Sequence, residues 1–219
     1  MKCRGFLFDL DGTLVDSLPA VERAWTHWGK RHAIDADEIL NFIHGKQAIT
    51  SLRHFMRGSS EEEIQQEFRL LEKTEAEDTD GVRALPGARD LLEQLNALEI
   101  PWAIVTSGSM PVASARRQAA GLPLPVHFVT AEQVKNGKPE PDAYLTGAKL
   151  LGLKPEECVV VEDAPAGILS GLAAGCAVIA VNAPADTPRL AETSLQLTTL
   201  TALRISKAPD GTVTVLTQN

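Results

Sequence analysis

The second half of the chain alternates short, continuous hydrophobic runs with amphipathic stretches. The hydrophobic runs cover residues 102–106, 126–129, 158–161 and 177–181. Such runs are typical of parallel strands that are buried on both faces of a sheet. The stretches around them have helical spacing, so the repeated β-α order predicts an α/β fold with a doubly wound, Rossmann-like parallel sheet. The expected helices span 88–98, 110–120, 142–151 and 164–174.

The first part of the chain has a different pattern. A hydrophobic run at 4–9 predicts one short buried strand, which ends at Asp11-Gly12. From residue 16 to about 80 the spacing is helical throughout, which predicts an inserted helical domain. The hydrophobic face of its first helix consists of Leu18, Val21, Trp25 and Trp28.

The end of the chain alternates β-branched and polar residues at 203–207 and 212–217. Because Pro209-Asp210-Gly211 lies between the two segments, the pattern predicts a C-terminal β-hairpin. Taken along the whole chain, these patterns predict two domains. Residues 1–15 and 82–219 would form the α/β core domain, and residues 16–81 would form the α-helical insertion.

Composition narrows the range of partners. The chain has 219 residues, of which 44% are hydrophobic, enough for one domain that carries a smaller inserted one. Its formal net charge of −8 disfavours nucleic acid and anionic membrane surfaces as partners. A small phosphorylated substrate would also be repelled, so local groups and a metal would have to bind it. We expect a monomer.

The cysteines and the N-terminus bear on location. Cys3, Cys158 and Cys176 are odd in number, widely spaced and without a C-x-x-C pair, which argues against a disulfide framework or a zinc site. The N-terminus shows no targeting pattern, and no stretch approaches the roughly 20 apolar residues that a membrane-spanning helix needs. These features predict buried thiols and a cytoplasmic protein.

Two carboxylates follow the first predicted strand, in the segment Phe8-Asp9-Leu10-Asp11-Gly12-Thr13. Because the chain turns here, the side chains of Asp9 and Asp11 can both face the crevice beyond the strand end, where parallel sheets bind ligands. Carboxylates this close repel each other unless a cation intervenes, and oxygen ligands suit Mg²⁺. The segment therefore predicts an acidic, magnesium-binding turn.

Three other strand ends carry polar groups. Thr106 and Ser107 offer hydroxyl and backbone N–H groups before a helix, which suits an anion but equally suits ordinary helix capping. Lys138 lies in a turn that Pro139 and Pro141 stiffen, and it is suited to pair with a phosphoryl oxygen. Glu162 and Asp163 directly follow a buried strand. Four independent helix caps would explain neither the lysine nor the doubled acids, so the joint pattern predicts a catalytic site.

In this order and combination the motifs resemble those of the haloacid dehalogenase superfamily, in particular its β-phosphoglucomutase-like branch of sugar phosphatases. The resemblance covers essentially the whole chain. It is carried by residues 9–17, by Thr106-Ser107, by Gly137-Lys138-Pro139-Glu140-Pro141-Asp142 and by Val161-Glu162-Asp163.

The resemblance implies a role for each motif. Asp9 would be the nucleophile that accepts the phosphoryl group, and Asp11 would protonate the leaving alcohol and then activate the water that cleaves the aspartyl-phosphate. Mg²⁺ would be held by the Asp9 carboxylate, the backbone carbonyl of Asp11 and Asp163, with Glu162 assisting; Thr106, the backbone N–H of Ser107 and Lys138 would hold phosphoryl oxygens. The implied enzyme is a magnesium-dependent phosphatase of sugar or sugar-alcohol phosphates.

The resemblance also implies that the helical insertion is a mobile cap, with hinges near 14–17 and 81–85. Within it, the turn His44-Gly45-Lys46-Gln47 is a candidate substrate-specificity loop, although a plain connection between helices is equally consistent with the sequence. Lys46 also leaves phosphonate cleavage open, because that reaction uses a cap lysine in this superfamily.

Two alternative functions remain. The resembling mutases typically carry a histidine on the first cap helix and an arginine in the cap loop, where this chain has Val21 and Ala48. The difference favours hydrolysis over phosphoryl transfer between sugar positions. A non-catalytic binding protein on the same fold is the other alternative, and the presence of Asp9, Asp11 and Lys138 argues against it.

Overall fold

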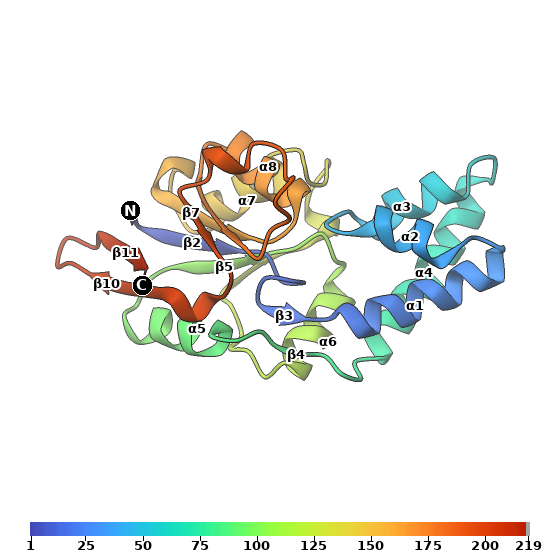
Figure 1. The fold of residues 1–219 in the computed structure, drawn as a ribbon, viewed down its shortest axis with the longest axis horizontal. Helices are drawn as coiled ribbons and strands as arrows, with labels where there is room; N and C mark the ends of the chain where they lie inside the picture. The colour runs from blue at the N-terminus through green and yellow to red at the C-terminus, as the bar shows by residue number, and fades with distance from the viewer. Residues whose placement is uncertain (218–219) are drawn as a thin grey trace.

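The computed structural model, which describes residues 1–217, is built around a six-stranded parallel sheet of order β6-β5-β2-β7-β8-β9 (Figure 1). Its strands are β2 (Gly5–Phe8), β5 (Trp102–Val105), β6 (His127–Val129), β7 (Cys158–Glu162), β8 (Ala177–Val181) and β9 (Leu195–Leu197). Four α-helices connect them: α5 (Ala88–Ala97), α6 (Met110–Ala119), α7 (Asp142–Leu150) and α8 (Pro165–Ala173). Short 3₁₀ helices lie at Ala131–Gln133, Pro155–Glu157, Leu190–Glu192 and Leu200–Ala202.

The central strands are buried on both faces because their side chains alternate between two hydrophobic layers. Along β2, Phe6 and Phe8 belong to one layer and Leu7 belongs to the other. Helices α5 and α6 cover the first layer, and α7 and α8 cover the second, on the opposite side of the sheet (Figure 1). The predicted doubly wound α/β core is thereby confirmed.

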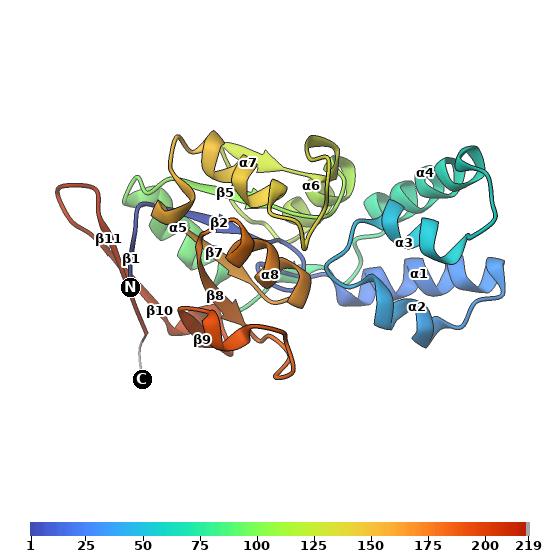
Figure 2. The ribbon, with the colours of Figure 1, turned by 90° about the horizontal axis from the view of Figure 1, so that it is seen from above.

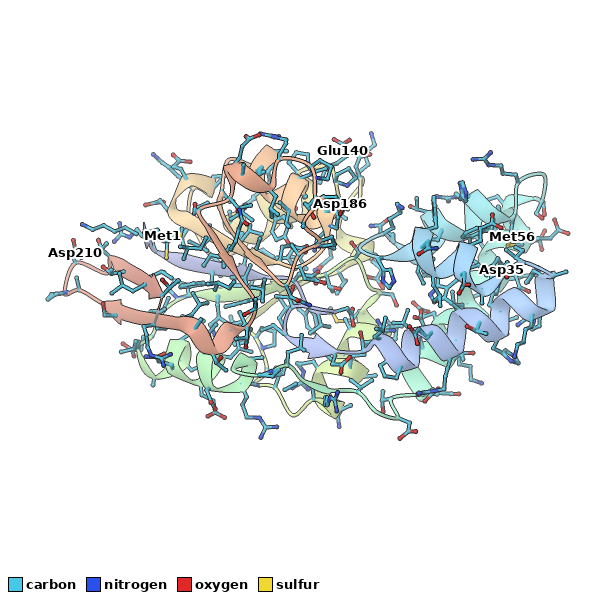
Figure 3. All side chains as sticks on the ribbon, viewed as in Figure 1. Met1, Asp35, Met56, Glu140, Asp186 and Asp210 are labelled. Carbon is cyan, nitrogen blue, oxygen red and sulfur yellow. The ribbon has the colours of Figure 1, made fainter. Side chains whose placement is uncertain are left out.

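The strand order places a crevice at the carboxyl end of β2. From β2 the chain adds β5 and β6 on one side and then returns to add β7, β8 and β9 on the other side. A reversal of this kind is where open α/β sheets bind ligands. Glu140 and Asp186, which follow β6 and β8, lie on the side of the sheet that faces helices α1 to α4 (Figure 3).

The ends of the chain form a separate three-stranded antiparallel sheet of order β1-β11-β10. The predicted hairpin is present as β10 (Leu203–Lys207) and β11 (Val213–Thr217), and Asp210 lies at its tip (Figure 3). Strand β1 (Lys2–Cys3), which the sequence pattern did not predict, pairs with β11, so the first and last strands of the fold lie side by side (Figure 2).

Helices α1 to α4, here called the helical unit, lie beyond the carboxyl end of the parallel sheet (Figures 1 and 2). They have a hydrophobic cluster of their own, formed around Trp25, Trp28 and Leu52. Ser60 begins the last helix with a capping box, in which its hydroxyl accepts from the Glu63 N–H and the Glu63 carboxylate accepts from the Ser60 N–H. The helices are α1 (Leu18–His32), α2 (Ala36–Ile43), α3 (Ala48–Phe55) and α4 (Glu61–Glu77).

Two chain segments connect the helical unit to the sheet. They pair as the short antiparallel strands β3 (Val15–Asp16) and β4 (Arg83–Ala84). This pairing lies at the two hinge positions expected from the sequence. Helix α4 also packs directly against α6, so the two parts meet through a helix pair as well as through the connecting strands.

The fold also bears on the expectations about the cysteines and about membrane-spanning helices. Cys3, Cys158 and Cys176 are free and buried, as predicted. Within residues 1–217, none of the helices combines the length and the apolar character needed to cross a membrane.

Candidate active site

A buried lysine occupies the crevice at the end of β2. The Lys138 ammonium donates to Asp9 Oδ1 at 2.7 Å, to Glu162 Oε1 at 2.7 Å and to the Val105 carbonyl at 3.0 Å. Asp9 directly follows β2, Glu162 ends β7 and Val105 ends β5, so the lysine joins three neighbouring strands. Three of the residues predicted from separate motifs are therefore in direct contact.

Glu162 is held from several sides. Its Oε1 also accepts from the Tyr144 hydroxyl at 2.8 Å, and its Oε2 accepts from the backbone N–H groups of Asp163 and Ala164 at 3.0 and 3.1 Å. A side chain at Gly167 would overlap this carboxylate, so helix α8 needs a glycine there. With both oxygens bound by protein donors, Glu162 fixes the position of Lys138. Its assistance to a metal stays a prediction.

Asp9, Glu162 and Asp163 form a group of three carboxylates whose oxygens lie within 4.8 Å of one another. Thr13 donates to Asp163 Oδ1 at 3.0 Å and orients it toward the group. Gly12 has a φ of +89°, and a Cβ there would overlap Asp163. One buried lysine does not balance three carboxylates, and hard oxygen ligands in this number suit a divalent cation. The residues present fit the metal that the sequence implied.

The pKa values of these groups reflect the crowding of negative charge. Burial, with help from the neighbouring Glu162 and Asp163, raises the pKa of Asp9 well above its usual range, although Lys138 opposes the shift. Burial and Glu162 raise the pKa of Asp163 to about 7. Burial alone would lower the pKa of Lys138, but Asp9 and Glu162 outweigh it and raise the pKa. A cation among the carboxylates would favour their ionised forms.

Asp11 points to a different set of partners. Its Oδ1 accepts from the Ser17 hydroxyl at 2.6 Å and lies 3.1 Å from Arg116 Nη1. The other terminal nitrogen of Arg116 lies 2.9 Å from Glu75 Oε1 on α4. Within residues 1–217, the three-carboxylate group does not include the Asp11 side chain. Its predicted contact with the metal, through the backbone carbonyl, remains a prediction.

Two of the three residues predicted to bind phosphate follow β5. Thr106 is buried, and its hydroxyl oxygen accepts from the Gly108 N–H at 3.0 Å. Ser107 donates through its hydroxyl to the carbonyl of Gly45 at 3.1 Å. Ser107 therefore joins the end of β5 to the predicted specificity loop of the helical unit.

The loop 44–47 lies against the α/β part of the fold at two further points. Gln47 Nε2 donates to the Ala131 carbonyl at 3.5 Å, and a Cβ added at Gly137 would press against the Gln47 side chain. Lys46 instead turns back on its own helix, where its ammonium donates to the Phe42 carbonyl at 2.6 Å and lies 3.8 Å from the centre of the Phe42 ring. His44 is exposed.

The sequence patterns assigned no individual role to five residues that hold the predicted ones, directly or through one another. They are Thr13, Ser17, Glu75, Arg116 and Tyr144. Tyr144 is the sole tyrosine of the chain and follows the Lys138 motif closely, which is a usable signal for a polar role. The Arg116–Glu75 contact joins two helices that are far apart in sequence, so no local sequence pattern predicts it.

Comparison with known proteins agrees with this geometry. The model of the haloacid dehalogenase-like hydrolase family matches residues 3–175. Hexitol phosphatase A of Escherichia coli K12 is 69% identical over 215 residues, which cover 98% of this chain and 100% of that protein. Glycerol-1-phosphate phosphohydrolase 2 of Saccharomyces cerevisiae is 36% identical and covers 88% of this chain and 80% of its own length.

A solved structure supports the same assignment. A hydrolase from Pseudomonas syringae superposes with a TM-score of 0.80 at 27% identity, over 90% of this chain and 94% of that one. Both curated relatives act on phosphate monoesters by name, which confirms the predicted phosphoric monoester hydrolase. On its motifs, its fold and these matches, the chain belongs to the haloacid dehalogenase-like hydrolase family.

Proposed function

We propose that this chain is a magnesium-dependent phosphatase that hydrolyses hexitol phosphates and related sugar phosphates through a phosphorylated Asp9. The observation that carries the proposal is the placement of Asp9 at the end of β2, where its carboxylate contacts Lys138 and shares a three-carboxylate group with Glu162 and Asp163. The hexitol phosphatase at 69% identity supports the substrate class.

In the first step, an Asp9 carboxylate oxygen forms a bond to phosphorus while the bond from phosphorus to the alcohol oxygen breaks. The like charges of carboxylate and phosphate oppose this approach, and the Lys138 ammonium beside Asp9 lowers that repulsion. When bound at Asp9, the backbone carbonyl of Asp11 and Asp163, Mg²⁺ would add electrostatic stabilisation of the phosphoryl oxygens. Thr106 and the Ser107 N–H would bind the remaining phosphoryl oxygens.

Asp11 is the proposed acid and base. It donates a proton to the departing alcohol oxygen in the first step. In the second step it takes a proton from water as the water oxygen attacks phosphorus, and the bond from Asp9 to phosphorus breaks. The products are the free alcohol and inorganic phosphate, and the Asp9 carboxylate is restored.

We further propose the division into a core of residues 1–15 and 82–219 and a cap of residues 16–81. The separate hydrophobic cluster of the helical unit and the β3–β4 pairing at its base support a unit that moves as one body. The loop 44–47 would contact the leaving alcohol when the cap closes, and Ser107 and Gln47 mark where it meets the core.

The chain lacks the side chains that a mutase of this fold would use. Val21 and Ala48 stand at the corresponding positions, and both are half-buried against the hydrophobic cluster of the helical unit. Neither can bind a second phosphate or assist transfer between sugar positions. We therefore expect no formation of glucose 6-phosphate from β-glucose 1-phosphate.

Turnover of sorbitol 6-phosphate and 4-nitrophenyl phosphate, with Mg²⁺ and with EDTA, tests the proposal. We expect hydrolysis of both substrates with Mg²⁺ and a loss with EDTA that added Mg²⁺ reverses. Asp9→Asn should lower kcat by about 10³ or more while the protein stays folded, because the amide is a far weaker nucleophile.

Two results would contradict the proposal. A folded wild-type protein that turns over neither phosphate ester with any divalent cation would indicate a binding protein on this fold. Full activity of Asp9→Asn would exclude the aspartyl-phosphate route.

A further inference from the structure

A buried ion triad joins the proposed acid and base to the helical unit. Arg116 on α6 contacts Asp11 Oδ1 through Nη1 at 3.1 Å and Glu75 Oε1 on α4 through Nη2 at 2.9 Å. The side chains of Arg116 and Glu75 are 5% and 8% exposed, while that of Asp11 is 27% exposed. One guanidinium therefore binds two carboxylates from two parts of the fold.

This triad is a costly way to hold two helices together. Taking charges out of water costs free energy that their attraction barely recovers, and a pair of hydrophobic residues often packs such an interface as well or better. Neither Arg116 nor Glu75 contacts the three-carboxylate group, so neither serves to bind the metal. The contact with Asp11 is therefore the feature that points to a functional role for the triad.

We propose that Arg116 is a positioning residue that holds the Asp11 carboxyl group through Oδ1, so that a proton on Oδ2 can be transferred to the leaving alcohol oxygen, and that Glu75 anchors Arg116 to helix α4. The inference rests on the proposed phosphatase function and adds to it a residue pair outside the predicted motifs.

The geometry explains how the anchor reaches Asp11. Ser17, at the start of α1, donates to the same Asp11 oxygen that Arg116 contacts, so the two partners hold one oxygen of this side chain from two different elements. Helix α4 carries Glu75 and packs along α6. A shift of the helical unit would move Glu75 relative to α6. Because the Arg116 guanidinium contacts both Glu75 and Asp11, that shift would also change the position of the Asp11 side chain.

The leaving group separates a positioning role from a purely structural one. A sugar-alcohol oxygen is a strong base and needs a proton as it departs, whereas 4-nitrophenolate departs without one. The ratio kcat/KM covers the steps up to the phosphorylated Asp9 and therefore reports on that proton transfer. Misplacing Asp11 should harm alkyl phosphates selectively.

The main test is the double variant Arg116→Met/Glu75→Met, which removes both members of the buried pair and leaves no unpaired charge between the helices. We expect kcat/KM for sorbitol 6-phosphate to fall about tenfold or more, and that for 4-nitrophenyl phosphate to change less than about threefold. Arg117→Met is the matched control. Arg117 on the same helix donates to the Leu122 carbonyl rather than to Asp11 or Glu75, so this change should leave kcat/KM for both substrates near wild type.

A second variant tests the same point without removing the charge. Arg116→Lys keeps a cation for Glu75 but loses the two-pronged fork that serves both carboxylates. We expect a selective loss of about threefold for the alkyl phosphate, with the thermal unfolding curve near wild type.

The outcomes are distinct. The positioning role would be overturned if a folded variant lost kcat/KM equally for the two substrates, or if its kcat/KM for sorbitol 6-phosphate stayed at the wild-type value. The phosphatase function would stand in either case. Wild-type protein that hydrolyses neither ester would overturn the proposed function, and this inference with it.

Discussion

The end of the parallel sheet and the loop 44–47 face each other, yet they are held by different forces. At the sheet end, Lys138 is bonded to Asp9 and Glu162 at 2.7 Å each, deep in the core. The loop is held to the core by one hydroxyl bond from Ser107 to Gly45 and by a 3.5 Å bond from Gln47.

The difference explains how chemistry and selectivity can be separated in one molecule. The sheet-end groups follow buried strands, so they cannot shift unless the core unfolds. The loop belongs to a unit with its own hydrophobic cluster, and its hydrogen bonds to the core, at 3.1 and 3.5 Å, are longer than those at the sheet end. Asp9 and Lys138 are thus held more firmly than the loop that we propose to meet the leaving alcohol.

The largest effect is expected from removing the buried lysine at the end of the parallel sheet. Lys138→Met would leave Asp9 and Glu162 buried without their common cation, and unfolding free energy should fall by about 3–5 kcal/mol. Turnover should drop by a factor of about 10² or more, because the positive charge beside Asp9, the proposed nucleophile, is lost. Chemical denaturation and kcat measure the two losses.

Lys135→Met is the control for this change. Lys135 is an exposed lysine of the same turn, so its loss should alter stability by less than about 0.5 kcal/mol. Equal stability of the two variants would show that the buried ion pairs do not stabilise the sheet end.

The next effect concerns charge crowding at the sheet end when metal is removed. Burial and the neighbouring Glu162 raise the pKa of Asp163 from its ordinary value of 3.8 to about 7, so between these pH values the folded protein binds more protons than the unfolded chain. Stability from this group is therefore present at low pH and is lost as pH rises toward 7.

The variant Asp163→Asn measures this pH-dependent contribution of Asp163 to the free energy of unfolding, in metal-free protein. From pH 5 to pH 8 the wild type should lose on the order of 2 kcal/mol relative to the variant, in unfolding by denaturant. Mg²⁺ should restore the wild type at pH 8 and have little effect on the variant. Parallel pH profiles of the two proteins would show that Asp163 is not crowded.

The smallest expected effect lies in the loop. Gln47→Ala removes a long, weak bond to the core, so we expect KM for sorbitol 6-phosphate to rise about threefold with kcat and stability nearly unchanged. Gln66→Ala, at an exposed position of α4, is the control and should leave KM unaltered. A large fall in kcat for Gln47→Ala would mean that the loop positions reacting groups as well.

Much of the fold could be predicted because local patterns carry it. The hydrophobic runs located β5, β6, β7 and β8 to within two residues, and the hairpin segments agree with β10 and β11 to within one. The strands that were missed are short or lie at sheet edges. Lys2–Cys3 and Leu195–Leu197 contain too few residues to show a period.

The site divides in the same way. The sequence by itself determined that Asp9, Lys138 and the pair Glu162-Asp163 are candidate site residues at strand ends. Asp9 and the acidic pair adjoin recognisable buried strands, and Lys138 lies in a turn stiffened by prolines. Only the tertiary structure decided that Arg116 reaches both Asp11 and Glu75, and that Ser107 bonds to Gly45. The physical reason is that strand periodicity is encoded in neighbouring residues, whereas the partner of a buried charge is set by how separate elements pack.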